Sequence, residues 1–151
     1  MTQEEYTKHL FQVLIMTEQA KNWLHRSYSI CSSIGIKDHY SDAELDDLEA
    51  LTSRFSRASD ILIQQVYRAI DEVELEQGGT VLDRLNRAEK RGLVDSVQEV
   101  RAIRELRNTI SHEYELADLI ELFHDTLSMT PALLQLIERA ENYCHSKYLN
   151  I

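Results

Sequence analysis

The sequence predicts an all-α protein, folded as an antiparallel bundle of four to five helices. The chain contains only four glycines and one proline, so it offers few places for turns and favours long helices over many short strands. Apolar residues recur every three or four positions over long stretches, which is the spacing of one helix face. With 151 residues, no internal repeat and no linker-like segment, residues 1–151 are expected to form a single domain.

Two long helices are predicted in the first half of the chain. The first covers residues 3–33, and its expected inward residues are Leu10, Val13, Leu14, Ala20, Leu24, Tyr28 and Cys31. The second begins at Ser41-Asp-Ala-Glu44, where the serine and glutamate side chains are typical of a capping box, and is expected to end at Gly78-Gly79. Its expected inward residues are Leu48, Leu51, Phe55, Ala58, Leu62, Val66, Ala69 and Val73. About 36 residues at 1.5 Å rise make a rod on the order of 54 Å long, for which the first helix is the natural antiparallel partner.

Three further helices are predicted in the second half. Thr80 can cap a short helix that Gly92 ends in a left-handed turn. Asp95 with Gln98 offers a capping box for the next helix, which carries the stretch RNTISHEY near its C-terminal end. The last helix runs from about 116 to 148, and Pro131 is expected to kink or split it. Its expected inward residues are Leu119, Phe123, Leu127, Leu134, Ile137 and Cys144.

The charge distribution limits the partners that the chain can have. A net charge of -10 argues against a broadly basic surface, so we expect no DNA partner and only local contact with RNA. The charge is uneven, since residues 38–49 carry six acids and no Lys or Arg, whereas residues 84–107 carry seven bases and four acids. No apolar run reaches the roughly 20 residues that cross a bilayer, and the first residues do not resemble an export signal. A cytoplasmic protein without a membrane partner is therefore expected.

The two cysteines and the absence of familiar motifs bear on metals and cofactors. Cys31 and Cys144 are expected to be reduced, buried thiols, with a disulfide as the alternative. His112-Glu113 is not followed by a histidine at zinc spacing, because Leu116 occupies that position, and Cys144-His145 are adjacent and point apart on a helix. The sequence also has no glycine-rich phosphate loop. We therefore expect no metal and no cofactor.

RNTISHEY, residues 107–114, places a polar face beside a core stripe. On a helical wheel, Ile103, Leu106 and Ile110 fall between about 260° and 320° from Arg107, which marks them as inward. A continuous polar face between 0° and about 140° is formed by Arg101, Arg104, Arg107, Asn108, Ser111 and His112. On this wheel Asn108 lies one turn before His112, where it can fix the tautomer of the imidazole. Arg101, Arg104 and Ser111 are the candidate RNA-binding residues on that face.

Arginine and histidine on one face suit RNA cleavage without a metal. An imidazole near its neutral pKa can take the proton of a ribose 2'-OH or donate one to the leaving oxygen, and a guanidinium can stabilise charge on the phosphate. The pair Arg-x4-His alone carries little weight, since about 0.4 such pairs are expected by chance. Requiring Asn108 and Tyr114 as well lowers the chance to below about one in a thousand chains.

Arg107-Asn108-x-x-x-His112-x-Tyr114 resembles the R-N-x-x-x-H-x-Y signature of the HEPN superfamily, in particular of HepT-like toxins encoded beside minimal nucleotidyltransferase antitoxins. The predicted order of helices is similar to that of the family too. The resemblance implies a helical endoribonuclease, usually a two-fold homodimer, with Arg107 and His112 as catalytic residues and Asn108 in support. It also implies that a cognate nucleotidyltransferase antitoxin attaches adenylate to Tyr114 and silences the toxin.

Other readings of the same residues stay open. The polar face can be a solvated surface laced by pairs such as Arg101 with Glu105, and Tyr114 can be an ordinary buried tyrosine. On the second long helix, Arg54, Arg57 and Asp60 are candidates for further polar site residues. The alternative function is a non-catalytic helical partner, or a substrate-binding subunit of a separate nucleotidyltransferase, which the acidic charge and long amphipathic helices suit.

Overall fold

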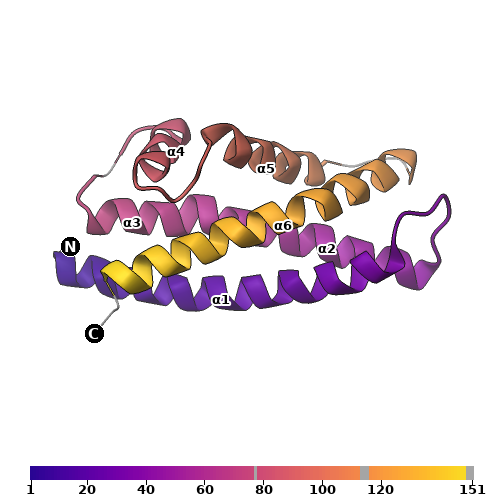
Figure 1. Cartoon of the computed structure of the whole chain (residues 1–151), viewed down its shortest axis with the longest axis horizontal. Helices are drawn as coiled ribbons and strands as arrows, with labels where there is room; N and C mark the ends of the chain where they lie inside the picture. Colours follow the sequence, from indigo (N-terminus) through magenta and orange to yellow (C-terminus); the bar gives the residue numbers. More distant parts are fainter. Residues whose placement is uncertain (77, 113–115, 149–151) are drawn as a thin grey trace.

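The computed structural model describes residues 1–76, 78–112 and 116–148, and its described part contains helices and no strand (Figure 1). The helices are α1 (Gln3–Ile34), α2 (Asp42–Asp60), the π-helix η1 (Ile61–Val66), α3 (Tyr67–Val73), α4 (Val81–Lys90), α5 (Val97–Ile110) and α6 (Leu116–Lys147). Because η1 joins α2 to α3 without a break, the described elements form five helical rods. The predicted all-α bundle is confirmed.

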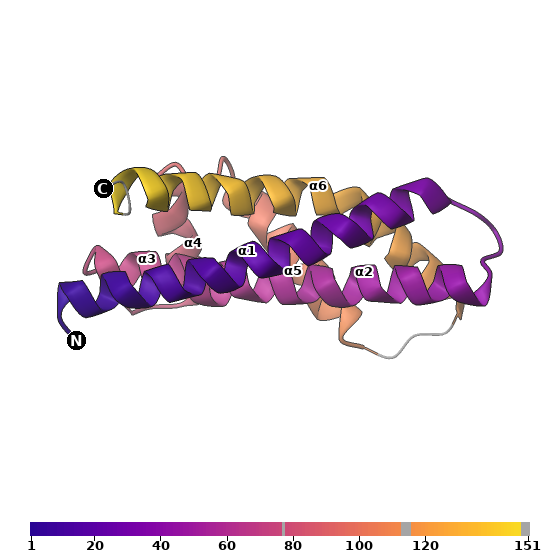
Figure 2. The same cartoon turned by 90° about the horizontal axis from the view of Figure 1, so that it is seen from below.

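The α2–η1–α3 rod runs antiparallel beside α1, as expected (Figure 2). Both rods start in capping boxes: Thr2 with Glu5 caps α1, and the predicted box of Ser41 with Glu44 caps α2. The predicted end at Gly78 is wrong, because α3 ends at Val73. Two residues later Leu75 adopts a left-handed φ of 60°, and the N–H of Glu76 donates to the carbonyl of Asp71, which closes the helix end.

The π-helix η1 is the feature of the rod that the periodicity did not predict. Its sequence, ILIQQV, places three consecutive buried residues, Ile61, Leu62 and Ile63, before the exposed Gln64 and Gln65. The wider π-turn rotates successive side chains by a smaller angle than an α-turn, which helps to keep all three on the core side. Asp60 is the last residue of α2, so it lies where the winding of the rod changes.

The N-cap predicted for α4 is confirmed, and the N-cap predicted for α5 is wrong by one residue. Thr80 caps α4 in a capping box with Asp83, and Gly92 has the expected left-handed φ of 77°. The predicted cap at Asp95 is wrong, because Ser96 is the N-cap of α5 and its side chain accepts from the N–H of Gln98. Asp95 instead forms an ion pair with Arg139 of α6, with 2.9 Å between Oδ1 and Nη2.

Helix α6 continues through Pro131, so the predicted split does not occur. Leu122 and Phe123 before the proline and Leu133, Leu136 and Ile137 after it are all buried in one core. Packing on both sides keeps the chain helical through the proline, although proline removes one backbone donor from the helix. The proline itself is exposed.

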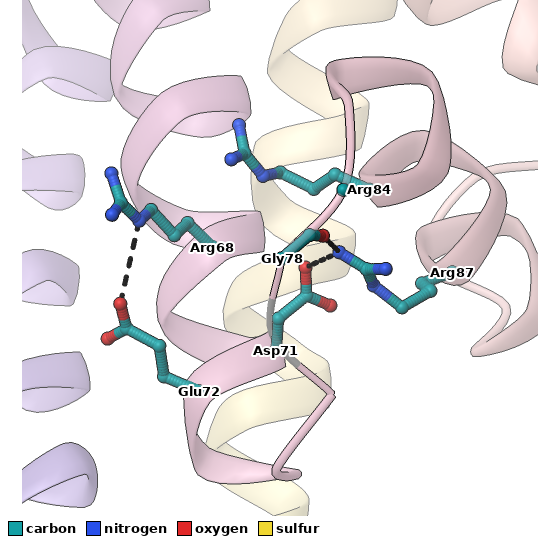
Figure 3. Close-up of a pocket in the computed structure, with 7 residues that line it drawn as sticks. Arg68, Asp71, Glu72, Gly78, Arg84 and Arg87 are labelled. Atoms are coloured by element: carbon teal, nitrogen blue, oxygen red, sulfur yellow. Dashed lines mark hydrogen bonds and ion pairs between the residues drawn. The ribbon is translucent and has the colours of Figure 1, made fainter.

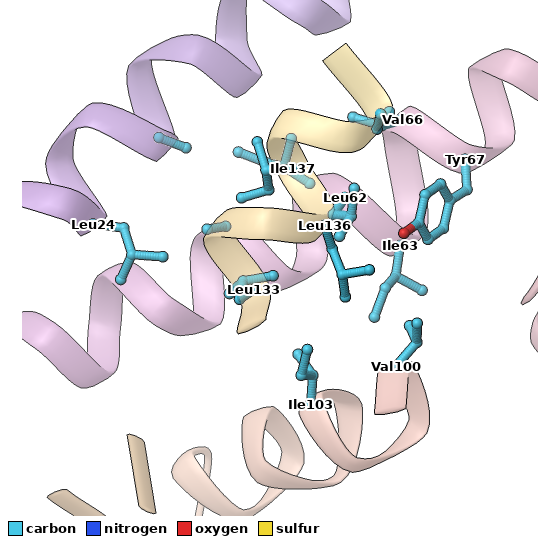
Figure 4. Packing of buried hydrophobic residues seen from close by; sticks show 14 of the residues in the cluster. Leu24, Leu62, Ile63, Val66, Tyr67, Val100, Ile103, Leu133, Leu136 and Ile137 are labelled. Atoms are coloured by element: carbon cyan, nitrogen blue, oxygen red, sulfur yellow. The ribbon is translucent and has the colours of Figure 1, made fainter. Parts of the chain in front are cut away.

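The buried apolar residues of the described chain form one cluster (Figure 4). Every inward residue predicted for the second rod is buried, and of those predicted for the first only Tyr28 is half-buried. Cys31 and Cys144 are free, buried thiols, so the alternative of a disulfide is excluded. Helix α5 packs against α2 and α6, which brings its C-terminal half beside the end of α2. This packing positions the candidate site.

Candidate functional site

Arg107 is held by Asp60 in a bidentate ion pair between α5 and α2. Nε donates to Oδ1 over 2.6 Å and Nη2 donates to Oδ2 over 2.9 Å, so the fork of the guanidinium matches both carboxylate oxygens. The hydrogen bond to Asp60 is the main reason why the pKa of Arg107 is raised above its ordinary value. The pair is partly open to solvent, with 32% and 42% of the two side chains exposed. The guanidinium is therefore fixed in direction and still accessible.

Ser111 adds a third contact to the guanidinium. Nη1 of Arg107 donates to Oγ of Ser111 over 2.5 Å, and this hydroxyl donates to the backbone carbonyl of Arg107 over 3.3 Å. These contacts with Asp60 and Ser111 use three of the five N–H groups that an arginine carries. Two N–H groups remain to donate to a ligand. Ser111, expected to contact RNA, thus lies against Arg107 and can orient it.

A groove of about 440 Å³ lies over this ion pair. It is lined by Ser59, Asp60, Ile63, Gln64, Gln65, Arg104, Arg107 and Asn108. The structure therefore brings three of the expected residues of α5 together in one depression with the end of α2 and the π-helix. The hydroxyl of Ser59 is buried and has no hydrogen-bond partner within the described residues. We call this depression the Arg107 groove.

Polar lining continues from the Arg107 groove along α2 towards α1. Asp60 and Gln65 also line a second groove of about 360 Å³ with Met16, Arg57 and Ile61. Arg57 then lines a third, of about 300 Å³, with Arg54 and Trp23. Arg54 itself donates from Nη1 to Oγ of Ser27 over 2.6 Å and lies 4.7 Å from the centre of the Trp23 ring. Of the three candidates on the second rod, Asp60 contacts Arg107, while Arg54 and Arg57 lie farther along this surface.

Arg101 lies one turn before Arg104 on α5, outside the Arg107 groove. It shares a depression of about 140 Å³ with Arg104, Glu105 and apolar residues of α4. The ion pair expected between Arg101 and Glu105 is absent from the described part of the chain. Arg104 belongs to both depressions, so it connects Arg101 to the groove.

The helical wheel fails at His112, because α5 ends at Ile110. The N–H groups of Ser111 and His112 donate to the carbonyls of Asn108 and Thr109, three residues back, so the chain tightens as it leaves the helix. The expected position of Asn108 directly beneath the imidazole assumed an α-helix that continues to His112, so it stays a prediction. His112 is exposed and follows the Arg107 groove in the chain, while Tyr114, the expected adenylylation site, lies outside the described residues.

Gln64 and Gln65 are groove residues that the sequence reasoning missed. The available signal was two adjacent amides inside an otherwise apolar run, ILIQQV, on a rod expected to be buried. Their placement depends on the π-turn of η1, which exposes both after three buried residues. The amides give the groove hydrogen-bond donors and acceptors without a charge.

In comparisons with known proteins, no protein-family model, no curated protein and no solved structure matches the chain. Within the described residues, His, Cys, Asp and Glu side chains do not gather in groups of three or more that could hold a metal ion. None of the described helices combines the length and the apolar character needed to span a membrane.

Proposed function

We propose that this chain is a metal-independent endoribonuclease, the toxin of a toxin–antitoxin pair, and that the Arg107 groove holds the scissile phosphate. The observation that carries the proposal is the fixed guanidinium of Arg107 at the floor of a polar groove, with Asn108 and Arg104 beside it. A guanidinium already oriented by Asp60 can stabilise charge on a phosphate without first reorganising.

His112 supplies the acid–base chemistry in this proposal. It takes the proton from a ribose 2'-OH, or donates a proton to the leaving 5'-oxygen, while Arg107 stabilises the charge that grows on the phosphate. The 2'-oxygen attacks the adjacent phosphorus as the bond to the 5'-oxygen breaks, so this transesterification consumes no water and calls for no metal. A two-fold homodimer through this face would bring two copies of Arg107, Asn108 and His112 around one cleft.

The antitoxin in the proposal is a minimal nucleotidyltransferase that adenylylates Tyr114. The support is the R-N-x-x-x-H-x-Y spacing, in which Tyr114 follows His112 by two residues. Adenylate attached there would add a negatively charged phosphate two residues from His112 in the sequence and oppose the binding of RNA. Co-expression with a cognate minimal nucleotidyltransferase is expected to raise the intact mass by whole adenylate units, and the variant Tyr114→Phe is expected to stay unmodified.

Cleavage of total RNA or tRNA tests the enzyme. We expect the wild type to cleave in the presence of EDTA, and Arg107→Ala and His112→Ala to lose cleavage. Arg139→Ala is the matched control, because it removes another partly exposed arginine that is paired with an aspartate, Asp95, away from the groove. Equal cleavage by the wild type and the two site variants would overturn the proposal.

A second candidate function is a non-catalytic partner of a separate nucleotidyltransferase. It is favoured by the apolar side chains that α1 exposes, Phe11 at 49%, Ile15 at 52% and Trp23 at 54%, on a chain with a net charge of -10. Under this function the pure chain cleaves no RNA yet forms a stable complex with the nucleotidyltransferase, which size-exclusion chromatography detects. An inert chain that stays alone at micromolar concentration would contradict it.

A further inference from the structure

Another depression, of about 220 Å³, lies between α3 and α4 (Figure 3). Figure 3 shows Arg68 extending from α3 and Arg84 and Arg87 from α4, with Asp71 and the backbone of Gly78 between them. The lining also includes Glu72 and Gly79. Its volume is several times the roughly 30 Å³ that one water occupies, so a phosphate group fits inside. We call it the arginine pocket.

The carboxylate at the centre of the arginine pocket is already neutralised. Asp71 is 2% exposed and accepts from Nη2 of Arg87 over 2.9 Å and from Nη1 of Arg91 over 2.5 Å. Arg91 also pairs with Glu74 and Glu76, so its charge is balanced outside the pocket. Among the residues that line the pocket, three arginines lie against two acids. Arg87 also donates to the carbonyl of Gly78 over 2.8 Å, which ties the loop before α4 to the pocket wall.

The hydrogen-bond acceptors that Arg84 contacts among the described residues are all uncharged. Its Nη1 donates weakly to the carbonyl of Ile63 over 3.4 Å and to Oε1 of Gln64 over 3.3 Å. No carboxylate oxygen of the described residues lies within 4.0 Å of its guanidinium, and its buried Nε has no hydrogen-bond partner among them. Burial, and the nearby charges of Arg68 and Arg87, lower the pKa of Arg84, although the charges of Asp71 and Glu72 oppose this shift. A half-buried guanidinium in this setting is stabilised by an added anion.

Arg68 completes the group from the other wall. Its Nε lies 3.5 Å from Oε1 of Glu72, a loose pair on a side chain that is 65% exposed. The pair leaves most of the guanidinium open to solvent and free to turn towards an incoming oxyanion. Three arginines then surround the pocket from two helices, and a phosphate group carries enough oxygens to accept from each of them.

The arginine pocket adjoins the Arg107 groove through two residues of η1. Gln64 lines the groove and accepts from Arg84, which lines the pocket. Ile63 links them too, since its side of η1 faces the groove and its carbonyl accepts from Arg84. A strand that places one phosphate over Arg107 therefore passes next to a second site of positive charge.

We propose that Arg68, Arg84 and Arg87 form a binding site for a phosphate group, and that this group is a backbone phosphate of the RNA strand held in the Arg107 groove. The assignment of RNA as the source rests on the proposed function, whereas the phosphate site itself rests on the pocket. The site positions the strand and takes no part in bond breaking.

Two measurements test the site and its source separately. In the first, inorganic phosphate is added to the protein against sodium chloride of equal ionic strength, and the thermal midpoint is recorded. Arg107→Ala serves as the background, because the Arg107 groove is itself proposed to hold a phosphate. In this background we expect phosphate to raise the midpoint of the parent protein and of Arg26→Met, a control on the exposed surface of α1, and to leave Arg84→Met unmoved. Arg68→Met, at a more exposed position, repeats the test if Arg84→Met does not fold, and is expected to weaken the effect.

In the second, a short single-stranded RNA is bound to His112→Ala, which keeps the strand intact, with and without Arg84→Met. We expect Arg84→Met to weaken RNA binding several-fold. We also expect it to reduce the steepness with which the logarithm of the binding constant falls with the logarithm of the salt concentration by about 0.7, the value for one phosphate contact on a single strand. Arg26→Met in the same background is expected to leave both unchanged.

The outcomes separate the two proposals. Phosphate stabilisation that disappears in Arg84→Met supports the site even if the wild type cleaves no RNA, in which case the proposed function fails alone. The same stabilisation with RNA binding unaffected by Arg84→Met overturns RNA as the source. If phosphate leaves the thermal midpoint unchanged with and without Arg84→Met, and Arg84→Met leaves RNA binding unchanged, the site is overturned. This holds even where the wild type cleaves RNA as proposed.

Discussion

Arg107 of α5 and Asp60 of α2 are joined by two parallel hydrogen bonds, of 2.6 and 2.9 Å, across the contact between their helices. The residues are 47 positions apart in the sequence, so the pair exists through the packing of α5 on the second rod. The carboxylate fixes one edge of the guanidinium, and the other edge is left for a ligand. Asp60 is therefore a positioning residue in the proposed function.

Asp60→Asn tests that role. We expect kcat for RNA cleavage to fall by about ten- to a hundredfold, because an amide has one acceptor oxygen and cannot accept from both Nε and Nη2, and a small misplacement of a charged group is costly in rate. Thermal stability is expected to change little, since a partly exposed ion pair contributes at most about 1 kcal/mol.

Asp95→Asn is the matched control for Asp60→Asn. It breaks the ion pair with Arg139, which has a similar length of 2.9 Å, is more exposed than the pair of Arg107 with Asp60, and lies away from the groove. Unchanged cleavage is expected for this control. If Asp60→Asn and Asp95→Asn behave alike in kcat, the ion pair with Arg107 has no positioning role.

Asp71→Ala is expected to destabilise the fold by about 3 kcal/mol, because it leaves the guanidiniums of Arg87 and Arg91 without their shared buried carboxylate. Urea unfolding followed by circular dichroism measures the loss. Asp125→Ala, at an exposed position of α6, is the control and is expected to change stability by less than about 0.5 kcal/mol. A loss for Asp71→Ala no larger than this control would mean that the two arginines find other partners.

Glu74 links the end of α3 to α6 and makes stability depend on acid. Burial opposes its ionisation, but hydrogen bonds from Tyr143 and Tyr148 and the charge of Arg91 lower the pKa of Glu74 from 4.5 to about 2. A carboxylate whose pKa is lowered in the folded state stabilises the fold at any pH above its ordinary pKa. This contribution is lost as the pH falls from about 4.5 towards about 2.

Glu74→Gln removes the titrating group. We expect the variant to be less stable than the wild type at pH 7 by on the order of 1 kcal/mol, after allowance for solvent screening, and the difference to shrink at pH 3. Urea unfolding at both pH values gives the comparison. A difference that stays the same at pH 3 and pH 7 would show that ionisation of Glu74 contributes nothing.

The thiols of Cys31 and Cys144 are expected to resist alkylation in the folded protein. Burial raises the pKa of Cys31 to about 11 and that of Cys144 to about 12, so almost no thiolate exists near neutral pH. Mass spectrometry after iodoacetamide treatment at pH 7.5 should find the native chain unmodified and the urea-unfolded chain doubly alkylated. Rapid alkylation of the native chain would indicate that one thiol is accessible.

Periodicity was sufficient to predict the long helices. Leu48, Phe55, Leu62 and Val73 recur in the spacing of one helix face, and burial of that face is what stabilises a long helix in a bundle. It could not predict η1, because a π-turn inside a rod keeps nearly the same apolar spacing on both sides. The difference matters locally, since it exposes Gln64 and Gln65 in the groove.

The helix ends near the site were harder to predict. Asp95 and Ser96 are both good N-cap residues, and the choice between them depends on partners far away in sequence, Arg139 for Asp95 and Glu89 for the N–H of Val97. The end of α5 at Ile110 has no glycine or proline to mark it. Asp60 could be named from the sequence as a candidate on the second rod. Its pairing with Arg107 could not be predicted, because it depends on how α5 packs against that rod.

The most direct measurement is cleavage of total RNA by the wild type and by Arg107→Ala, side by side and in EDTA. The proposed function requires cleavage by the wild type and at least a hundredfold loss in Arg107→Ala, because the variant lacks the group that stabilises charge on the phosphate. Arg139→Ala, assayed in parallel, is expected to match the wild type. Cleavage by Arg107→Ala at the rate of the wild type, or no cleavage by any of the three, would contradict the proposed function.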